Sequence, residues 1–264
     1  MKTLKNNNIT FAIVILTLAT GLCSCKKDSA VKPSASASQM SFGLRADNTT
    51  AVLASASGIV LNSIQATTAI TPVISWTTGT ANVAKFKFEA KKAGVETEIE
   101  ARGLTNVNLF AIDQAFVGTK VDTGTYSEIE FKLELAKSAG ANIPLVLKGS
   151  FTNAAAVIVP VELDVNEDLE IKTEINNVVI DNTTDLKTTF MLHLDKMFTG
   201  ITSADLASAT LTSGTLVISS TSNSALYNKI KANLVNVGGH DIEGEHHGHN
   251  GSDDKGGDSH STGH

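Results

Sequence analysis

Six of the seven histidines of the chain lie after Gly238, interspersed with acidic residues, glycine and serine. They are His240, His246, His247, His249, His260 and His264. Neutral imidazoles and carboxylates are good ligands for Zn²⁺, Ni²⁺ or Cu²⁺. The polar composition predicts that residues 239–264 are disordered. Such a chain could wrap several ligands round one ion, with binding that weakens below about pH 6.5 as the imidazoles take up protons. The alternative is a solvated polar tail that binds metal only in the test tube.

A second polar segment begins like a calcium-binding loop, with side-chain oxygens at Asp164, Asn166 and Asp168. A calcium loop of this type needs glycine at its sixth position and glutamate at its twelfth. Leu169 and Ile175 occupy those positions. We therefore expect the end of a strand and a turn with solvated acids.

Motifs of enzyme catalysis are missing from the sequence. There is no Gly-x-Ser-x-Gly elbow, no His-Glu-x-x-His zinc motif and no phosphate-binding loop. His193, the one histidine outside the tail, lies in an apolar stretch, where we expect a structural or solvent-facing role. We expect no enzymatic activity; a hydrolase that uses dispersed carboxylates is the alternative.

The N-terminal segment has the features of an export signal. Lys2 and Lys5 precede an apolar run from Ile9 to Leu22. This run is too short to span a bilayer, for which about 20 residues are needed. A short apolar run behind basic residues is typical of a cleaved signal peptide.

The end of this segment resembles a lipobox, with Leu22 at −3, Ser24 at −1 and Cys25 at +1. We expect cleavage after residue 24 and lipid attachment to Cys25. Because Cys23 would leave with the signal peptide, the mature chain would have no disulfide and no free thiol. The alternative is an ordinary signal peptide with an incidental cysteine.

Charge excludes one class of partner. The whole chain carries −6, and loss of Lys2 and Lys5 leaves 19 basic against 27 acidic residues, or −8. This balance argues against nucleic acid and against electrostatic adhesion to anionic lipid.

Alternation of apolar and polar residues dominates from residue 40 to about 221. In 83–91, Ala84, Phe86, Phe88 and Ala90 would share one face, with Val83, Lys85, Lys87 and Glu89 on the other. In 126–135 the inward side chains would be Ile129, Phe131, Leu133 and Leu135. This period predicts half-buried strands. Further strands are predicted at 41–46, 95–101, 104–110, 144–152, 156–164, 169–175, 187–195 and 215–219.

Two short helices are predicted near the C-terminus. The first covers 203–209 with Ser203 as its N-cap. The second covers 222–235, has an apolar stripe of Leu226, Ile230 and Leu234, and ends before Gly238-Gly239. Many short strands with short turns predict an all-β, mainly antiparallel β-sandwich with one or two short C-terminal helices.

The predicted organisation has four parts. They are a signal peptide at 1–24, the lipidated cysteine with a flexible tether at 25–39, a β-sandwich region at 40–238, and the tail at 239–264. A division of the sandwich into two sub-domains near 136–140 stays open. The similar stretches Phe86-Lys-Phe-Glu89 and Phe131-Lys-Leu-Glu134 indicate either two strand–turn–strand units stacked in a sandwich or a coincidence of composition.

The lipobox followed by Cys25-Lys-Lys-Asp28 resembles that of lipoproteins from Bacteroidota-type bacteria, in which residues just after the lipidated cysteine act as a surface-export signal. Segments 123–129 and 226–233 are also similar to uncharacterised β-rich lipoproteins of this group. The resemblance implies an outer-membrane location, on either the surface or the periplasmic face. It carries no activity and no catalytic residues.

These observations together predict a lipid-anchored cell-envelope protein with a non-catalytic binding, adhesion or structural role. Its partners would be the membrane, through the lipid on Cys25, and an envelope protein or glycan. The rival prediction is capture of Zn²⁺, Ni²⁺ or Cu²⁺ by the histidine-rich tail; no other cofactor is expected. The sequence gives no oligomeric state.

Overall fold

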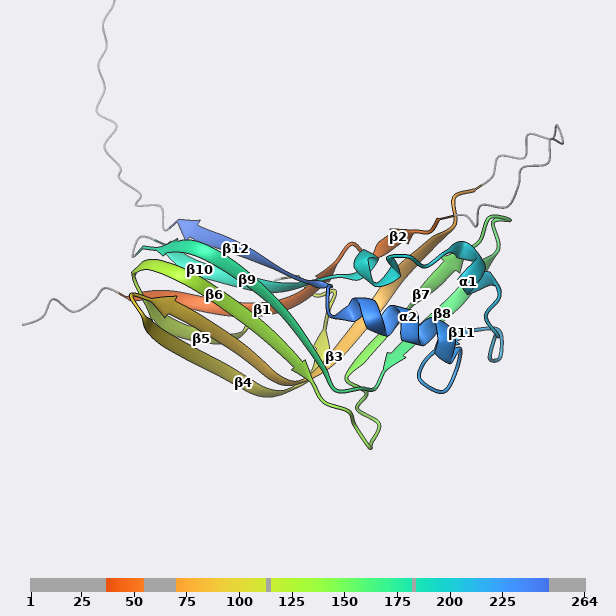
Figure 1. Ribbon diagram of the computed structural model, residues 1–264, viewed down its shortest axis with the longest axis horizontal. Helices are drawn as coiled ribbons and strands as arrows, with labels where there is room; N and C mark the ends of the chain where they lie inside the picture. Colours follow the sequence, from red (N-terminus) through yellow and green to blue (C-terminus); the bar gives the residue numbers. More distant parts are fainter. Residues whose placement is uncertain (1–36, 55–69, 113–114, 182–183, 247–264) are drawn as a thin grey trace, which may run out of the picture. The chain divides into compact units, whose positions relative to one another are not determined.

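The structure is a computed structural model that describes residues 37–54, 70–112, 115–181 and 184–246, all within one compact unit. Its strands form two sheets, mostly antiparallel, and helices are few. The predicted all-β, sandwich-like fold is therefore confirmed (Figure 1).

The smaller sheet has the strand order β12-β10-β1-β5. Its strands are β1 (Ala37–Asp47), β5 (Ala115–Asp122), β10 (Thr184–His193) and β12 (Gly238–His246). β1 runs parallel to β10, and the other pairs are antiparallel.

The larger sheet is built round one long strand, β3 (Val73–Lys92), in the order β11-β8-β7-β3-β6-β9, with β2 and β4 also pairing with β3. Residues 73–81 of β3 pair with β7, and residues 85–91 pair with β6. The loop at 136–144 joins β6 to β7. The remaining strands are β2 (Thr50–Val52), β4 (Val95–Asn108), β6 (Gly124–Leu135), β7 (Leu145–Thr152), β8 (Ile158–Val165), β9 (Leu169–Ile180) and β11 (Leu216–Ile218).

The inward faces of the two sheets share one apolar core. The ring of Phe42 on β1 lies 4.9 Å from that of Phe88 on β3 and 6.3 Å from that of Phe131 on β6. All three rings are fully buried. Because one face of each strand must be shielded from water, the period-two pattern dictates this two-layer packing.

Three helical elements complete the core. They are the 3₁₀ helix η1 (Leu194–Phe198), α1 (Ser203–Ala207) and α2 (Ser224–Leu234). Trp76 of β3 packs against Phe198 of η1, with ring centroids 6.1 Å apart. The stripe predicted on the second helix is correct, since Leu226, Ile230 and Leu234 are buried.

The first helix begins at Ser203, the start of the predicted range 203–209, but ends at Ala207, and its N-cap differs from the prediction. Thr202, rather than Ser203, is its N-cap, because Thr202 and Asp205 exchange hydrogen bonds in a capping box. The second helix ends at Leu234, and Gly238 begins a strand instead of ending the helix.

The prediction of a structureless tail from residue 239 is wrong for residues 239–246, which belong to β12 and pair antiparallel with β10. Edge pairing supplies hydrogen bonds that local composition does not reveal. Similarly, residues 37–39 of the predicted tether belong to β1. Residues 1–36 and 247–264, with the signal peptide, Cys25 and the rest of the tail, lie outside the described residues.

The face assigned to Val83 and Ala84 is also wrong. Val83 is buried and Ala84 is exposed. The alternation along β3 changes phase between Val83 and Phe86, both of which are buried, where the strand passes from its pairing with β7 to its pairing with β6. The two similar stretches at 86–89 and 131–134 are antiparallel neighbours in one sheet, since Phe88 pairs with Phe131, and they do not stack across the sandwich.

Candidate functional site

Of the six histidines predicted to bind metal, the structure describes the side chain of His240 alone. His246 ends β12, and nothing is described of its side chain; His247, His249, His260 and His264 lie outside the described residues. Cys25, the predicted lipidation site, also lies outside them.

His240 sits where β12 approaches β9. Its Nδ1 lies 3.0 Å from the Oγ1 of Thr173 on β9. Partial burial lowers the pKa of His240, the nearby His193 lowers it further, and Asp241 opposes both effects. With one ring nitrogen engaged by Thr173, His240 has one nitrogen left for a ligand.

His193 on β10 forms a side-chain hydrogen bond to β1. Its Nδ1 lies 2.6 Å from Oδ1 of Asp47, which is its register partner on β1. A catalytic triad uses the same histidine–carboxylate pair, with the other ring nitrogen facing a nucleophile. Here Nε2 lies over Gly239, where a Cβ atom would overlap it. The pair therefore joins strands, as a structural role predicts.

The segment that begins like a calcium loop, 164–168, forms hydrogen bonds to a neighbouring loop. Asn166 Oδ1 accepts a hydrogen bond from the backbone N–H of Ser138, and Asp168 Oδ1 accepts one from that of Lys137. Burial raises the pKa of Asp164. These oxygens fasten the loop after β6 to the turn between β8 and β9, which agrees with the predicted strand end and turn.

The most unusual polar feature is the outer face of β4, β3, β6 and β9, which we call the charged face. Residues directly opposite on neighbouring strands share a face, so the pairing register defines its four rows. The rows are Arg102, Lys85, Glu134 and Glu170; Glu100, Lys87, Lys132 and Lys172; Glu98, Glu89, Glu130 and Glu174; and Glu96, Lys91, Glu128 and Asn176.

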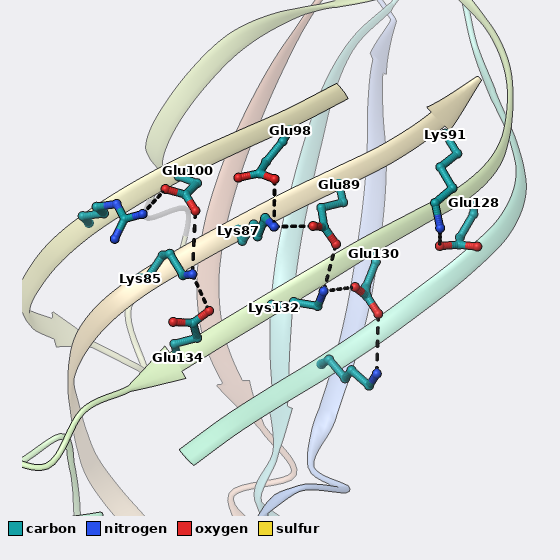
Figure 2. A network of polar contacts seen from close by, with 12 residues as sticks. Lys85, Lys87, Glu89, Lys91, Glu98, Glu100, Glu128, Glu130, Lys132 and Glu134 are labelled. Atoms are coloured by element: carbon teal, nitrogen blue, oxygen red, sulfur yellow. Dashed lines mark hydrogen bonds and ion pairs between the residues drawn. The ribbon is translucent and has the colours of Figure 1, made fainter. Parts of the chain in front are cut away.

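In the two middle rows, like charges stand side by side: Lys87, Lys132 and Lys172 in one, and Glu98, Glu89, Glu130 and Glu174 in the other. Opposite charges meet between these two rows (Figure 2). Glu89 contacts both Lys87 and Lys132, the latter at 2.9 Å. Glu130 lies 2.5 Å from Lys132. Within the first row, Lys85 lies 2.6 Å from Glu134. The row of lysines is thus interleaved with the row of glutamates.

The contacts between the lysine row and the glutamate row shift the pKa values of Glu89 and Lys132. Hydrogen bonds from Lys87 and Lys132 lower the pKa of Glu89 to about 2. Hydrogen bonds to Glu130 and Glu89 raise the pKa of Lys132. Glu89 and Lys132 therefore stay ionised across the ordinary range of pH. Each exposed pair adds little to stability, but together the pairs link β4, β3, β6 and β9.

Metal binding on the charged face is opposed by its lysines. Among the residues that the structure describes, one group of three acidic side chains, Glu89, Glu96 and Glu98, could surround an ion. The ammonium group of Lys87 already contacts Glu89 and lies 2.8 Å from Glu98. A cation would have to displace it, so the group is better described as an ion-pair network.

A polar hollow of about 540 Å³ lies beside the start of α2. Asp205, Ser222, Ser224 and Lys229 are among its lining residues, and Lys229 lies 2.6 Å from Asp205. The hydrogen bond from Lys229 and those from Thr202 lower the pKa of Asp205 to about 2. The charge of Lys229 is therefore already neutralised by Asp205 within the hollow.

Sequence reasoning placed several charged side chains on outward strand faces but missed the charged face as a unit. Alternating charge was visible at 96–100 and 170–174 as well as at 85–91 and 128–134. The order β4-β3-β6-β9, which aligns them, depends on pairing between strands far apart in sequence.

Comparison with known proteins gives no family for this chain: no family model, no curated protein and no solved structure matches it. Within the described residues, no helix is both long and apolar enough to cross a bilayer.

Proposed function

We propose that this chain is a lipid-anchored cell-envelope protein whose β-sandwich has a non-catalytic binding, adhesion or structural role. The observation that carries the proposal is the single cysteine left at the predicted cleavage site, behind a basic and apolar leader. A thiol at that position is the acceptor in lipoprotein maturation, and several acyl chains together anchor a protein stably.

Two features of the described fold support a non-catalytic role. The histidine–carboxylate pair, His193 and Asp47, is turned against the backbone of β12. On the charged face, contacts with Lys87 and Lys132 lower the pKa of Glu89, which is the opposite of the shift that a general acid requires.

The location proposed is the outer membrane. Lys26, Lys27 and Asp28 follow Cys25 in the manner of a surface-export signal. Exposure at the surface is tested by treating intact cells with protease. Loss of the protein from intact cells supports surface exposure, whereas loss only after the outer membrane is opened supports the periplasmic face.

The anchoring itself is tested by comparing Cys25→Ser with the matched variant Cys23→Ser in cells fed labelled palmitate. Cys23→Ser should incorporate label and enter the membrane fraction like the natural protein. Cys25→Ser should incorporate none and should leave that fraction. Equal labelling of the two variants would overturn the proposal.

A further inference from the structure

The point at which the chain enters the fold is fixed by strand register. β1 begins at Ala37, which pairs with Asp122 at the end of β5. The turn after Asp122 leads to Gly124, which pairs with Ile180 at the end of β9. The start of β1, the turn between β5 and β6, and the end of β9 therefore share one end of the fold, which we call the entry end.

The end of β3 and the end of β12 also lie there. Lys92, the last residue of β3, donates a hydrogen bond to the carbonyl oxygen of Thr123 in the turn between β5 and β6. At the other side, His246 pairs with Thr184, the first residue of β10. The C-terminal segment thus leaves the fold at the same end at which the N-terminal segment enters (Figure 1).

Side-chain contacts hold the turn between β5 and β6 in place at the entry end. The hydroxyl of Tyr126 donates to the carbonyl oxygen of Asp122, four residues earlier, at 2.7 Å. The ammonium group of Lys92 lies 5.7 Å from the centre of the Tyr126 ring. These contacts lock the β5–β6 turn onto β3, in the manner of the tyrosine corners of β-sandwiches.

The opposite end carries different side chains. Val52, Val73, Thr152 and Ile158 form one row across β2, β3, β7 and β8. Val52 is 70% exposed and Ile158 is 67% exposed. The next row, Thr50, Ser75, Ser150 and Pro160, is also uncharged. The outer face of this sheet therefore changes from charged to uncharged with distance from the entry end.

We infer that the entry end faces the lipid surface and that the uncharged end of β2, β3, β7 and β8 is held away from it. This inference rests on the lipid anchor proposed at Cys25. Eleven residues lie between Cys25 and Ala37, and this stretch spans at most about 40 Å. The tether therefore keeps the entry end within about 40 Å of the membrane, whereas the opposite end, across the 20 residues of β3, can lie about 65 Å further away.

One consequence is that the acidic, histidine-rich segment after His246 starts on the membrane side.

The test uses four exposed valines as single-cysteine labelling sites. Val95 and Val179 lie at the entry end, and Val52 and Val157 lie at the opposite end; all are more than half exposed. In lipidated protein the Cys25 thiol is blocked, so an engineered cysteine is the only one that takes a fluorescent donor. The protein is reconstituted in phosphatidylcholine vesicles that carry an acceptor on the lipid headgroup.

Energy transfer should be several-fold greater from Val95→Cys and Val179→Cys than from Val52→Cys and Val157→Cys. Equal transfer, or greater transfer from the second pair, in protein whose acylation is verified by mass would overturn the orientation alone. Absence of acyl mass would overturn the proposed function and the orientation with it. Combining each label with Cys25→Ser should abolish transfer at all four sites.

Discussion

Lys87 and Lys132 lie directly opposite each other on neighbouring strands, and the carboxylate of Glu89 contacts both. Like charges in directly opposed positions destabilise a sheet. The pairing of β3 with β6 therefore depends on the glutamates between the lysines.

Glu89→Gln should consequently lower the free energy of unfolding by about 1 kcal/mol, at the upper end for exposed ion pairs, because one change leaves two lysines opposed. Urea denaturation measures this. Glu170→Gln, at an exposed corner of the charged face, is the matched control and should change stability by less than about 0.3 kcal/mol. Equal effects of the two substitutions would contradict the central position of Glu89.

The stabilising effect of Glu89 should depend on pH in a defined direction. Its pKa is lowered from 4.5 to about 2 in the folded protein. A lowered carboxyl pKa contributes stability above its ordinary value, and this contribution is lost as pH falls through the folded value. The difference in unfolding free energy between the natural protein and Glu89→Gln should be constant above about pH 5 and close by about pH 2. A difference that persists at pH 2 would show that the effect is not ionic.

Gly239 should be required because the His193 ring lies over it. Gly239→Ala should cost about 2 kcal/mol, since a Cβ atom would overlap Nε2 of His193. His193→Ala should remove most of that cost. Gly238→Ala is the comparison, because its Cβ would meet the backbone oxygen of Lys172 at 2.7 Å, and His193→Ala should give no relief. A Gly239→Ala cost unchanged by His193→Ala would refute the contact.

Metal uptake by the tail is tested best with a chain that ends at His246, which keeps β12 intact. Calorimetry should show that zinc uptake by the mature protein is lost in this shortened chain, while its thermal stability is unchanged. A chain that ends at Gly239 should be less stable, since most of the pairing between β10 and β12 is removed. Equal zinc uptake by the mature protein and the chain ending at His246 would disprove metal capture by the tail.

The alternation of apolar and polar residues correctly predicted which side chains are buried in strands with a regular register. The alternation at 126–135 placed Phe131 and Leu133 inward, and both are buried. The same logic failed at Val83, because the alternation of β3 changes phase where its pairing passes from β7 to β6. β5 at 115–122 and β12 at 238–246 were missed, since their sequences have weak apolar alternation and they are held by neighbouring strands.

The candidate site divides in the same way. The outward position of Lys87 and Lys132 follows from period two, but their opposition depends on which strands become neighbours. The Asp47–His193 contact joins residues 146 positions apart, and no spacing rule predicts such a pair. Cys25, the proposed lipidation site, can by contrast be predicted from sequence alone, because its short motif is recognised before the chain folds.

The central claim concerns the sulfur of Cys25, and mass spectrometry of the protein purified from its own membranes tests it most directly. The account predicts an N-terminal peptide that begins at Cys25 and carries the added mass of acyl chains. A peptide with the Cys25 thiol unmodified, or with residues 1–24 still attached, would contradict it.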